Sequence, residues 1–317
     1  MRLPLSVPPP GSRPFDIVGF GQNSIDLLTV VAEHPAPNSK QRVQRFARLP
    51  GGQIATALVA CARLGQRTRY VGSFGADDLG SLSRASLEQE GVDLTASRVV
   101  AGATNQFAVI LVDGRSGERA VLWDRHPALS MESGDVPVDA IQSGRLLLVD
   151  CDEPSAATRA AREARSAGIP TLVDVEKVRP GVADLLQHID AIIAAEEFPP
   201  ALTGHEQLGR SLEAMGRDLG ASLVCVTLGA QGSLAWCNGR EIRTSAFPVD
   251  CVDSTGAGDA FRGGFAAACL GAPDGELEDA LCFANAVAAL KCRALGARSG
   301  LPTPSEVQHL MLARPRM

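Results

Sequence analysis

The sequence predicts an α/β fold, a doubly wound and mainly parallel sheet flanked by helices, with a small second β-sheet attached. From about residue 145 onward, short apolar stretches alternate with amphipathic stretches rich in Ala, Arg and Glu. This alternation is typical of βαβ units. At residues 104–123 the segments TNQFAVILVD and ERAVLWD flank the turn signal DGRSG, which predicts a hairpin outside this rhythm. We expect one domain over residues 1–317, with strands of the small sheet inserted at about 38–50 and 103–125.

The individual elements follow from periodicity and turn residues. FDIVGFG at 15–21 and RTRYVGSFG at 67–75 are predicted as strands, and the alternating segment QRVQRFARL at 41–49 as a half-exposed strand. After Gly51-Gly52, QIATALVACARLG is predicted as a helix that ends at Gly65. Ligands of open parallel sheets bind beyond the carboxyl ends of the strands. The polar residues expected there are Asp26, Asp150, Asp174, Glu197 and those of the loop after Thr227.

Charge and composition exclude several function classes. Thirty basic and thirty-six acidic residues give a net charge of −6, without a basic run interleaved with aromatics, so we expect no nucleic-acid partner. Because the overall charge is negative, a phosphate group would have to be bound by a local arrangement of backbone N–H groups and an ion. The longest apolar runs fall short of a membrane span. The eight cysteines form no CxxC pair, which favours reduced thiols and a cytoplasmic protein.

The segment most informative about chemistry is CVDSTGAGDAFRGGFAAACLG, residues 251–271. Gly256 and Gly258 allow a tight turn that presents N–H groups to an anion. The helix that follows contributes the positive end of its dipole. A carboxylate here would repel phosphate, so Asp259 makes most sense as a group that accepts a proton from an attacking hydroxyl. A capped helix with glycines chosen for close packing is the simpler alternative.

This segment resembles the C-terminal signature of the ribokinase-like (PfkB) family of carbohydrate kinases. Four other segments resemble family motifs in the same order: Gly51-Gly52 with its helix, VGSFGADDLG, VTLGAQGS and FANAVAALKC. The matches extend over roughly residues 16 to 304, nearly the whole chain. The resemblance implies an ATP-dependent kinase with a small β-sheet lid over a sugar, a lid that commonly pairs with a second subunit to form a homodimer.

The resemblance also assigns roles to individual residues. It makes Asp259 the catalytic base and Gly256-Ala257-Gly258 the anion hole. The expected substrate contacts are Asp26, Gly51, Gly52, Thr56 and Asp152, although Asp150 competes with Asp152 for its role. The expected ATP contacts are Thr227, Gly229, Gly232 and Asn285. Asp253 and Thr255 correspond to positions that bind a monovalent cation such as K⁺ in ribokinase-like members.

Two departures from the family pattern stand out. Ala194 and Ala195 stand where the family often has an Asn near the metal and phosphates, which leaves Glu197 or Glu196 to hold Mg²⁺ through water. Thr56 stands where ribokinase presents an Asn to the sugar, which weakens the case for ribose.

The predicted function is ATP-dependent phosphorylation of a hydroxyl group of a small sugar, with a free furanose or ketohexose favoured. Two alternatives keep the same fold: a kinase of a nucleoside or sugar phosphate, and a non-catalytic sugar sensor. The segment GFGQNS also suggests a Rossmann oxidoreductase, but it lacks the third glycine of the fingerprint.

Overall fold

A computed structural model describes residues 1–116 and 118–313. Its largest sheet has eight strands in the order β14-β13-β12-β11-β10-β9-β1-β4. The strands are β1 (Phe15–Phe20), β4 (Thr68–Val71), β9 (Gly144–Asp150), β10 (Thr171–Val175), β11 (Ala191–Ala195), β12 (Leu223–Thr227), β13 (Ser233–Cys237) and β14 (Arg240–Thr244). In this sheet the neighbouring strands β4, β1, β9, β10, β11 and β12 pair in parallel. Strands β13 and β14 are added in antiparallel pairing. The prediction of a mainly parallel sheet is confirmed.

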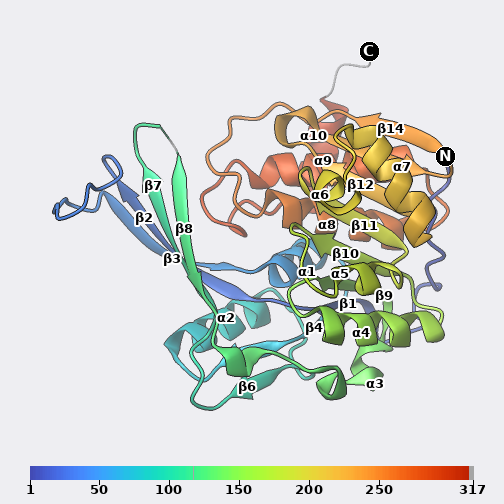
Figure 1. Ribbon diagram of the computed structural model, residues 1–317, viewed down its shortest axis with the longest axis horizontal. Helices are drawn as coiled ribbons and strands as arrows, with labels where there is room; N and C mark the ends of the chain where they lie inside the picture. Colours follow the sequence, from blue (N-terminus) through green and yellow to red (C-terminus); the bar gives the residue numbers. More distant parts are fainter. Residues whose placement is uncertain (117, 314–317) are drawn as a thin grey trace.

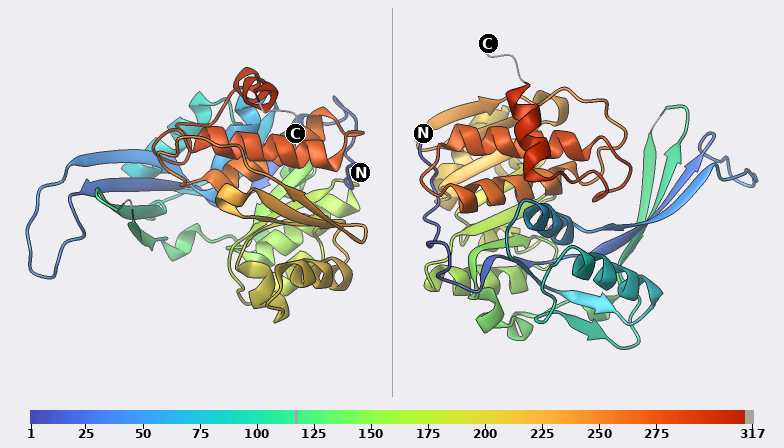
Figure 2. Two further views of the ribbon diagram at one scale, coloured as in Figure 1. Left: turned by 90° about the horizontal axis from the view of Figure 1, so that it is seen from above. Right: turned by 180° about the vertical axis from the view of Figure 1, so that it is seen from behind.

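Helices cover both faces of this sheet (Figures 1 and 2). One layer contains α1 (Gln53–Arg63), α8 (Ala257–Gly271), α9 (Leu277–Lys291) and α10 (Pro304–Leu312), with α2 (Asp78–Gln89) beside it. The other contains α3 (Val138–Ile141), α4 (Pro154–Ser166), α5 (Val182–Leu186), α6 (Phe198–Thr203) and α7 (Leu208–Leu219). Short 3₁₀ turns are η1 (Pro127–Leu129), η2 (Ser133–Asp135) and η3 (Gly229–Gln231). Side chains alternate across a strand, so adjacent residues of β1 enter different cores. Ile17 packs in the core with α1 and α8, and Val18 packs in the core on the opposite face of the sheet. This explains why the central strands are apolar throughout.

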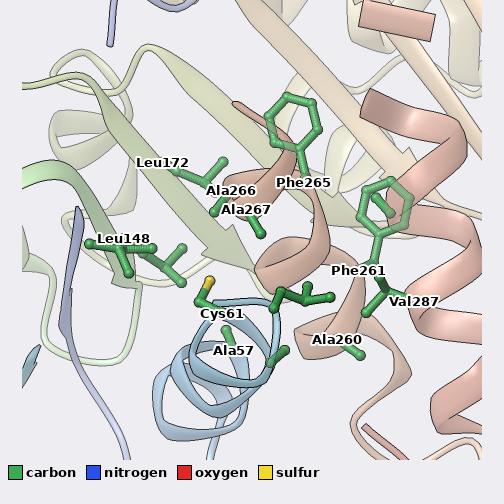
Figure 3. Close-up of a cluster of buried hydrophobic side chains, with 14 of the residues drawn as sticks. Ala57, Cys61, Leu148, Leu172, Ala260, Phe261, Phe265, Ala266, Ala267 and Val287 are labelled. Atoms are coloured by element: carbon green, nitrogen blue, oxygen red, sulfur yellow. The ribbon is translucent and has the colours of Figure 1, made fainter. Parts of the chain in front are cut away.

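Helix α8, which carries the chemistry-bearing motif, packs closely against α1. Figure 3 shows side chains of α1, α8 and the neighbouring strands meeting in one cluster, with Cys61 and Ala57 facing α8. The Cys61 thiol donates to the carbonyl of Gly263 at 3.2 Å. The small side chains on both helices bring the two backbones together, and this contact sets the position of the N-terminus of α8.

A separate four-stranded sheet extends to one side of the main body (Figure 1). We call it the lid sheet: β3 (Arg45–Gly51), β2 (Ser24–Val31), β7 (Phe107–Asp113) and β8 (Arg119–Asp124), in that order. The antiparallel pairing of β7 with β8 confirms the predicted hairpin. Strand β2 was not predicted, because no element was assigned between the strands expected at 15–21 and 41–49. It pairs with β3 and β7 and carries Asp26, so that residue belongs to the lid sheet and not to a loop.

One further segment differs from expectation. RTRYVGSFG is not one strand: the chain leaves the main sheet at Gly72, and β5 (Ser73–Gly75) pairs with β6 (Arg98–Val100). The N-terminal residues are packed, with the amino group of Met1 paired with Glu278 at 2.7 Å. Within the described residues, no helix is both long enough and apolar enough to cross a membrane.

The close approach of α1 and α8 makes Gly263 sensitive to substitution. A Cβ at Gly263 would lie 2.6 Å from the carbonyl oxygen of Ala57 and 2.7 Å from the Cβ of Ala60. We expect Gly263→Ala to lower the free energy of unfolding by about 1–3 kcal/mol in urea titrations, because overpacking displaces the helices. Gly271→Ala, at the end of the same helix with open space around it, is the control and should not lower stability. Equal effects of the two changes would contradict the role given to this contact.

Candidate active site

Helix α8 begins at a left-handed turn. Gly256 has φ 76° and precedes Ala257, the first helical residue. A side chain at Gly256 would be strained at this φ and would also collide with Ala297, 2.8 Å from the added Cβ. The first N–H groups of a helix have no acceptor within the helix. The N–H of Ala257 donates to Ser254 at 3.1 Å, so the N–H groups of the next residues are the better candidates to hold an anion.

A cavity of about 560 Å³ lies between this turn and the lid sheet, and we call it the lid cavity. Asp259 and Asp26 both line it, one from α8 and the other from β2. Gly52 and Gln53 line it from the start of α1, and the lid sheet contributes Ala108, Ile110, Val121 and Trp123. The lid sheet thus contributes an apolar part of the lining together with the charged groups of Asp26 and Arg119, and the rest of the lining is largely polar, which suits a small molecule rich in hydroxyl groups.

A second cavity, of about 460 Å³, lies on the other side of the turn between α8 and α9; we call it the α8–α9 cavity. Four residues expected to contact ATP line it: Thr227, Gly229, Gly232 and Asn285. The Asn285 side chain donates to Ser233 Oγ at 3.0 Å and to the carbonyl of Leu281 at 3.0 Å. Ser254 and Gly258 line both cavities, so the two spaces meet at the turn that begins α8.

Asp259 is only 9% exposed. Burial raises its pKa to about 7, the carboxylates of Glu176 and Asp26 act in the same direction, and the guanidinium of Arg262 opposes them. Arg262 is held by Asp174, 2.7 Å away. A carboxyl with a pKa near neutrality can accept a proton and release it again at physiological pH.

Asp26 lies beside a buried arginine. Arg298 donates to the carbonyl of Gly51, to Thr56 Oγ1 at 3.3 Å and to Ser86 at 3.1 Å. Burial raises the pKa of Asp26 to about 6, against the pull of Arg298. Gly51 and Thr56, expected at the substrate, are in this structure partners of Arg298, and neither is among the residues that line the lid cavity.

Asp152 lines the lid cavity and pairs with Arg179 at 2.6 Å. Its neighbour Asp150 is buried and accepts from the N–H groups of Gln22, at 2.7 Å, and Asp152, at 3.2 Å. Burial raises the pKa of Asp150 to about 8. Of the two competing carboxylates, Asp152 therefore faces the cavity and Asp150 holds the backbone behind it.

The residues expected to organise metal ions lie apart. Glu197 is exposed at the start of α6, outside the residues that line the two cavities. Glu176, two residues beyond Asp174 at the end of β10, does line the lid cavity. The part of the chain that the structure describes contains no cluster of three His, Cys, Asp or Glu side chains suited to a metal. Mg²⁺ takes most of its ligands from substrate phosphates and waters, so a single carboxylate such as that of Glu176 is sufficient on the protein side.

Asp253 and Thr255 lie in the segment that leads into the turn. The Asp253 carboxylate accepts from the N–H of Thr255 at 2.9 Å and from the N–H of Gly296 at 2.7 Å. The backbone carbonyl of Asp253 accepts from the ammonium of Lys291 at 2.7 Å. These oxygens already have donors, so they do not fit a bare monovalent cation.

The sequence analysis missed several residues of the lid cavity: Gln22, Glu176, Lys177, Arg179 and Arg119. It also missed Arg298 and Lys291 behind the cavity walls. Glu176 and Lys177 follow a predicted strand directly, so their position beyond its carboxyl end was a usable signal. Arg119, Arg298 and Lys291 lie far along the chain from the residues that they approach, and nothing local marks them.

Comparison with known proteins agrees with this geometry. The family model of the pfkB family carbohydrate kinases matches residues 15–304. An ATP-dependent ribose-1-phosphate kinase of Halopiger xanaduensis is 31% identical over 301 residues, 94% of this chain and 98% of the relative. A nucleoside kinase of Methanothermobacter thermautotrophicus is 29% identical over 299 residues, covering 92% and 94% of the two chains. The structure of Arabidopsis thaliana ribokinase complexed with ribose and ATP superposes with a TM-score of 0.83 at 27% identity, covering 94% of this chain and 98% of that one.

The fold and site define a kinase of small alcohols, with two cavities that meet at a helix N-terminus. The chain belongs to the pfkB family of carbohydrate kinases and has the ribokinase-like fold. Membership of this family makes it an ATP-dependent phosphotransferase.

Proposed function

We propose that this protein transfers the γ-phosphoryl group of ATP to a hydroxyl group of a small sugar, with a free furanose or ketohexose as the favoured acceptor. The observation that carries the proposal is the position of Asp259. It lines the lid cavity next to Gly258, which together with Ser254 lines the α8–α9 cavity as well. An acceptor in the first space and ATP in the second would meet in front of this carboxylate.

The chemistry follows from this placement. The Asp259 carboxylate accepts the proton of the acceptor hydroxyl while the hydroxyl oxygen attacks the γ-phosphorus, and the bond to ADP breaks. The N–H groups that follow Ala257, beginning with that of Gly258, and the dipole of α8 stabilise the charge on the transferred group. Asp26 and Asp152 accept hydrogen bonds from other hydroxyls and so orient the sugar. The lid sheet excludes water, which would otherwise compete for the phosphoryl group.

Mg²⁺ would neutralise charge on the β- and γ-phosphates. Glu176 is the carboxylate best placed to hold it through water, because it lines the lid cavity. Glu197, at the start of α6, remains a second candidate.

Two other acceptors fit the same site. Arg119 and Lys177 add positive charge to the lid cavity and suit a sugar phosphate, since basic side chains bind phosphate well. The relative that phosphorylates ribose 1-phosphate agrees with this alternative, and the nucleoside kinase with a nucleoside acceptor. A sensor without activity would have no need for the base and the glycine turn, and both are present.

Replacing the base tests the proposal directly. In an ADP-release screen over about thirty sugars, sugar phosphates and nucleosides, we expect turnover of at least one acceptor. Asp259→Asn should lower kcat on the order of a hundredfold or more while ATP binding, measured by calorimetry, is retained. Asp279→Asn, an exposed Asp in the first turn of α9, is the matched control. Near-normal turnover by Asp259→Asn would remove this residue from the role of base.

The pH dependence of the reaction should report the ionisation of Asp259. A base must be deprotonated, and the pKa of this carboxyl is about 7. We expect kcat/KM to be level above pH 7 and to fall about tenfold per unit below it. Below pH 6 the slope should steepen as Asp26, with a pKa of about 6, also takes up a proton. A constant kcat/KM from pH 5 to 8 would contradict this assignment.

We also propose that the protein forms a homodimer through the lid sheet. Large apolar side chains are exposed on β3 and β8, among them Phe46, Leu122 and Trp123, the last two 69% and 64% exposed. These are the two edge strands of the lid sheet, and exposed apolar side chains on an open sheet edge favour pairing with a second chain.

Sedimentation velocity at micromolar concentration should therefore show a dimer, and Leu122→Asp should shift it toward the monomer because a buried charge is costly. Val178→Asp, at an apolar residue that is 47% exposed and lies outside the lid sheet, is the control. A monomeric parent protein would refute the dimer.

A further inference from the structure

The segment that leads into the α8 turn is held by a buried lysine. Lys291 is the last residue of α9, and it is 0% exposed. Its ammonium donates to the backbone carbonyl of Asp253 at 2.7 Å. Removing an ammonium from water is costly unless the group is paired, so fully buried lysines are rare. Lys291 contacts Asp253, which directly precedes Ser254, a residue that lines both cavities.

Other hydrogen bonds tie the same two segments together. The carbonyl of Cys292 accepts from the N–H groups of Val252 at 2.8 Å and Asp253 at 3.1 Å. The Asp253 carboxylate accepts from Gly296 and from Thr255, as described above. Ser254, Thr255 and Gly256 follow directly and line the lid cavity. The position of the α8 turn therefore depends on how firmly Asp253 is held.

A monovalent cation could hold such a segment, because carbonyl and carboxylate oxygens can replace its hydration shell. At Asp253, however, the carbonyl and both carboxylate oxygens already accept hydrogen bonds from N–H donors. The donor at the carbonyl is itself a unit positive charge. Burial lowers the pKa of Lys291 and the nearby Asp253 carboxylate opposes that shift.

We propose that the ammonium of Lys291 takes the structural part of a monovalent cation in this protein. It acts as a positioning residue that orders the Asp253–Gly256 segment, so that the reaction does not require K⁺. The inference rests on the proposed kinase function. Because the charge belongs to the chain, the turn would be equally ordered in sodium, potassium or choline salts.

The parent protein gives the first test, without any variant. Its kcat and its melting temperature should differ little, less than about twofold in kcat, between choline, sodium, potassium and ammonium chloride at equal ionic strength. A stimulation of more than fivefold by K⁺, or a rise in melting temperature that K⁺ causes and Na⁺ does not, would overturn the inference. If the protein phosphorylates none of the acceptors, the proposed function fails, and the melting temperatures still decide the role of Lys291.

Variants give the second test. Lys291→Ala should lower kcat by about ten- to a hundredfold in choline chloride through misplacement of the turn, and K⁺, ammonium or methylammonium should restore part of it by entering the space left. Lys291→Met, which fills that space without a charge, should lose activity and not be restored. Arg293→Ala, at an exposed residue two positions further on, is the control and should match the parent in every salt. Full activity of Lys291→Met in choline chloride would overturn the inference.

Discussion

The whole site depends on the placement of one helix N-terminus between two cavities. Helix α8 must begin where Ser254 and Gly258 can line both the lid cavity and the α8–α9 cavity. Its position is set by contacts that lie outside these two cavities. On one side the backbone of α8 approaches α1 so closely that Gly263 has no room for a Cβ. On the other, the segment before the turn is hydrogen-bonded to the residues that follow α9. A phosphoryl group can be stabilised only by donors that are already in position, because moving them during the reaction would cost free energy.

The electrostatics of the site explain how an acidic protein can handle ATP. The chain carries a net charge of −6, and several carboxylates lie in or near the lid cavity. Their burial raises the pKa values of Asp26, Asp152 and Asp259, and the guanidinium groups of Arg262 and Arg298 oppose the shift at Asp259. These two guanidinium groups lie behind the walls of the cavity, in addition to the basic side chains that line it. They keep the pKa of Asp259 near 7, so that the carboxylate form is available as a base, and they add no basic face to the surface.

The lid sheet joins recognition of the acceptor to the exclusion of water. Strand β2 follows β1 of the main sheet after a short loop and belongs to the lid sheet, and Asp26 lies in this strand. An acceptor bound to Asp26 therefore contacts the lid sheet and the main body together. Movement of the sheet would change the distance from the acceptor to Asp259, so in the proposed reaction the strand that carries Asp26 would also control access to Asp259.

Much of this protein is determined by local sequence. The βαβ rhythm, the β7–β8 hairpin and the glycine turn before Asp259 depend on side-chain periodicity and backbone conformation within a few residues, and all were predicted. The tertiary structure alone decided the rest. It turned Asp152 toward the cavity and Asp150 toward the backbone, although the two are two residues apart, because packing of the whole sheet sets which side chain faces the cavity. It split RTRYVGSFG between two sheets, made β2 a lid strand, and brought Arg298 to Gly51 and Lys291 to Asp253. These contacts join residues that are far apart in the chain, and such distances are fixed only when the cores on both faces of the sheet have formed.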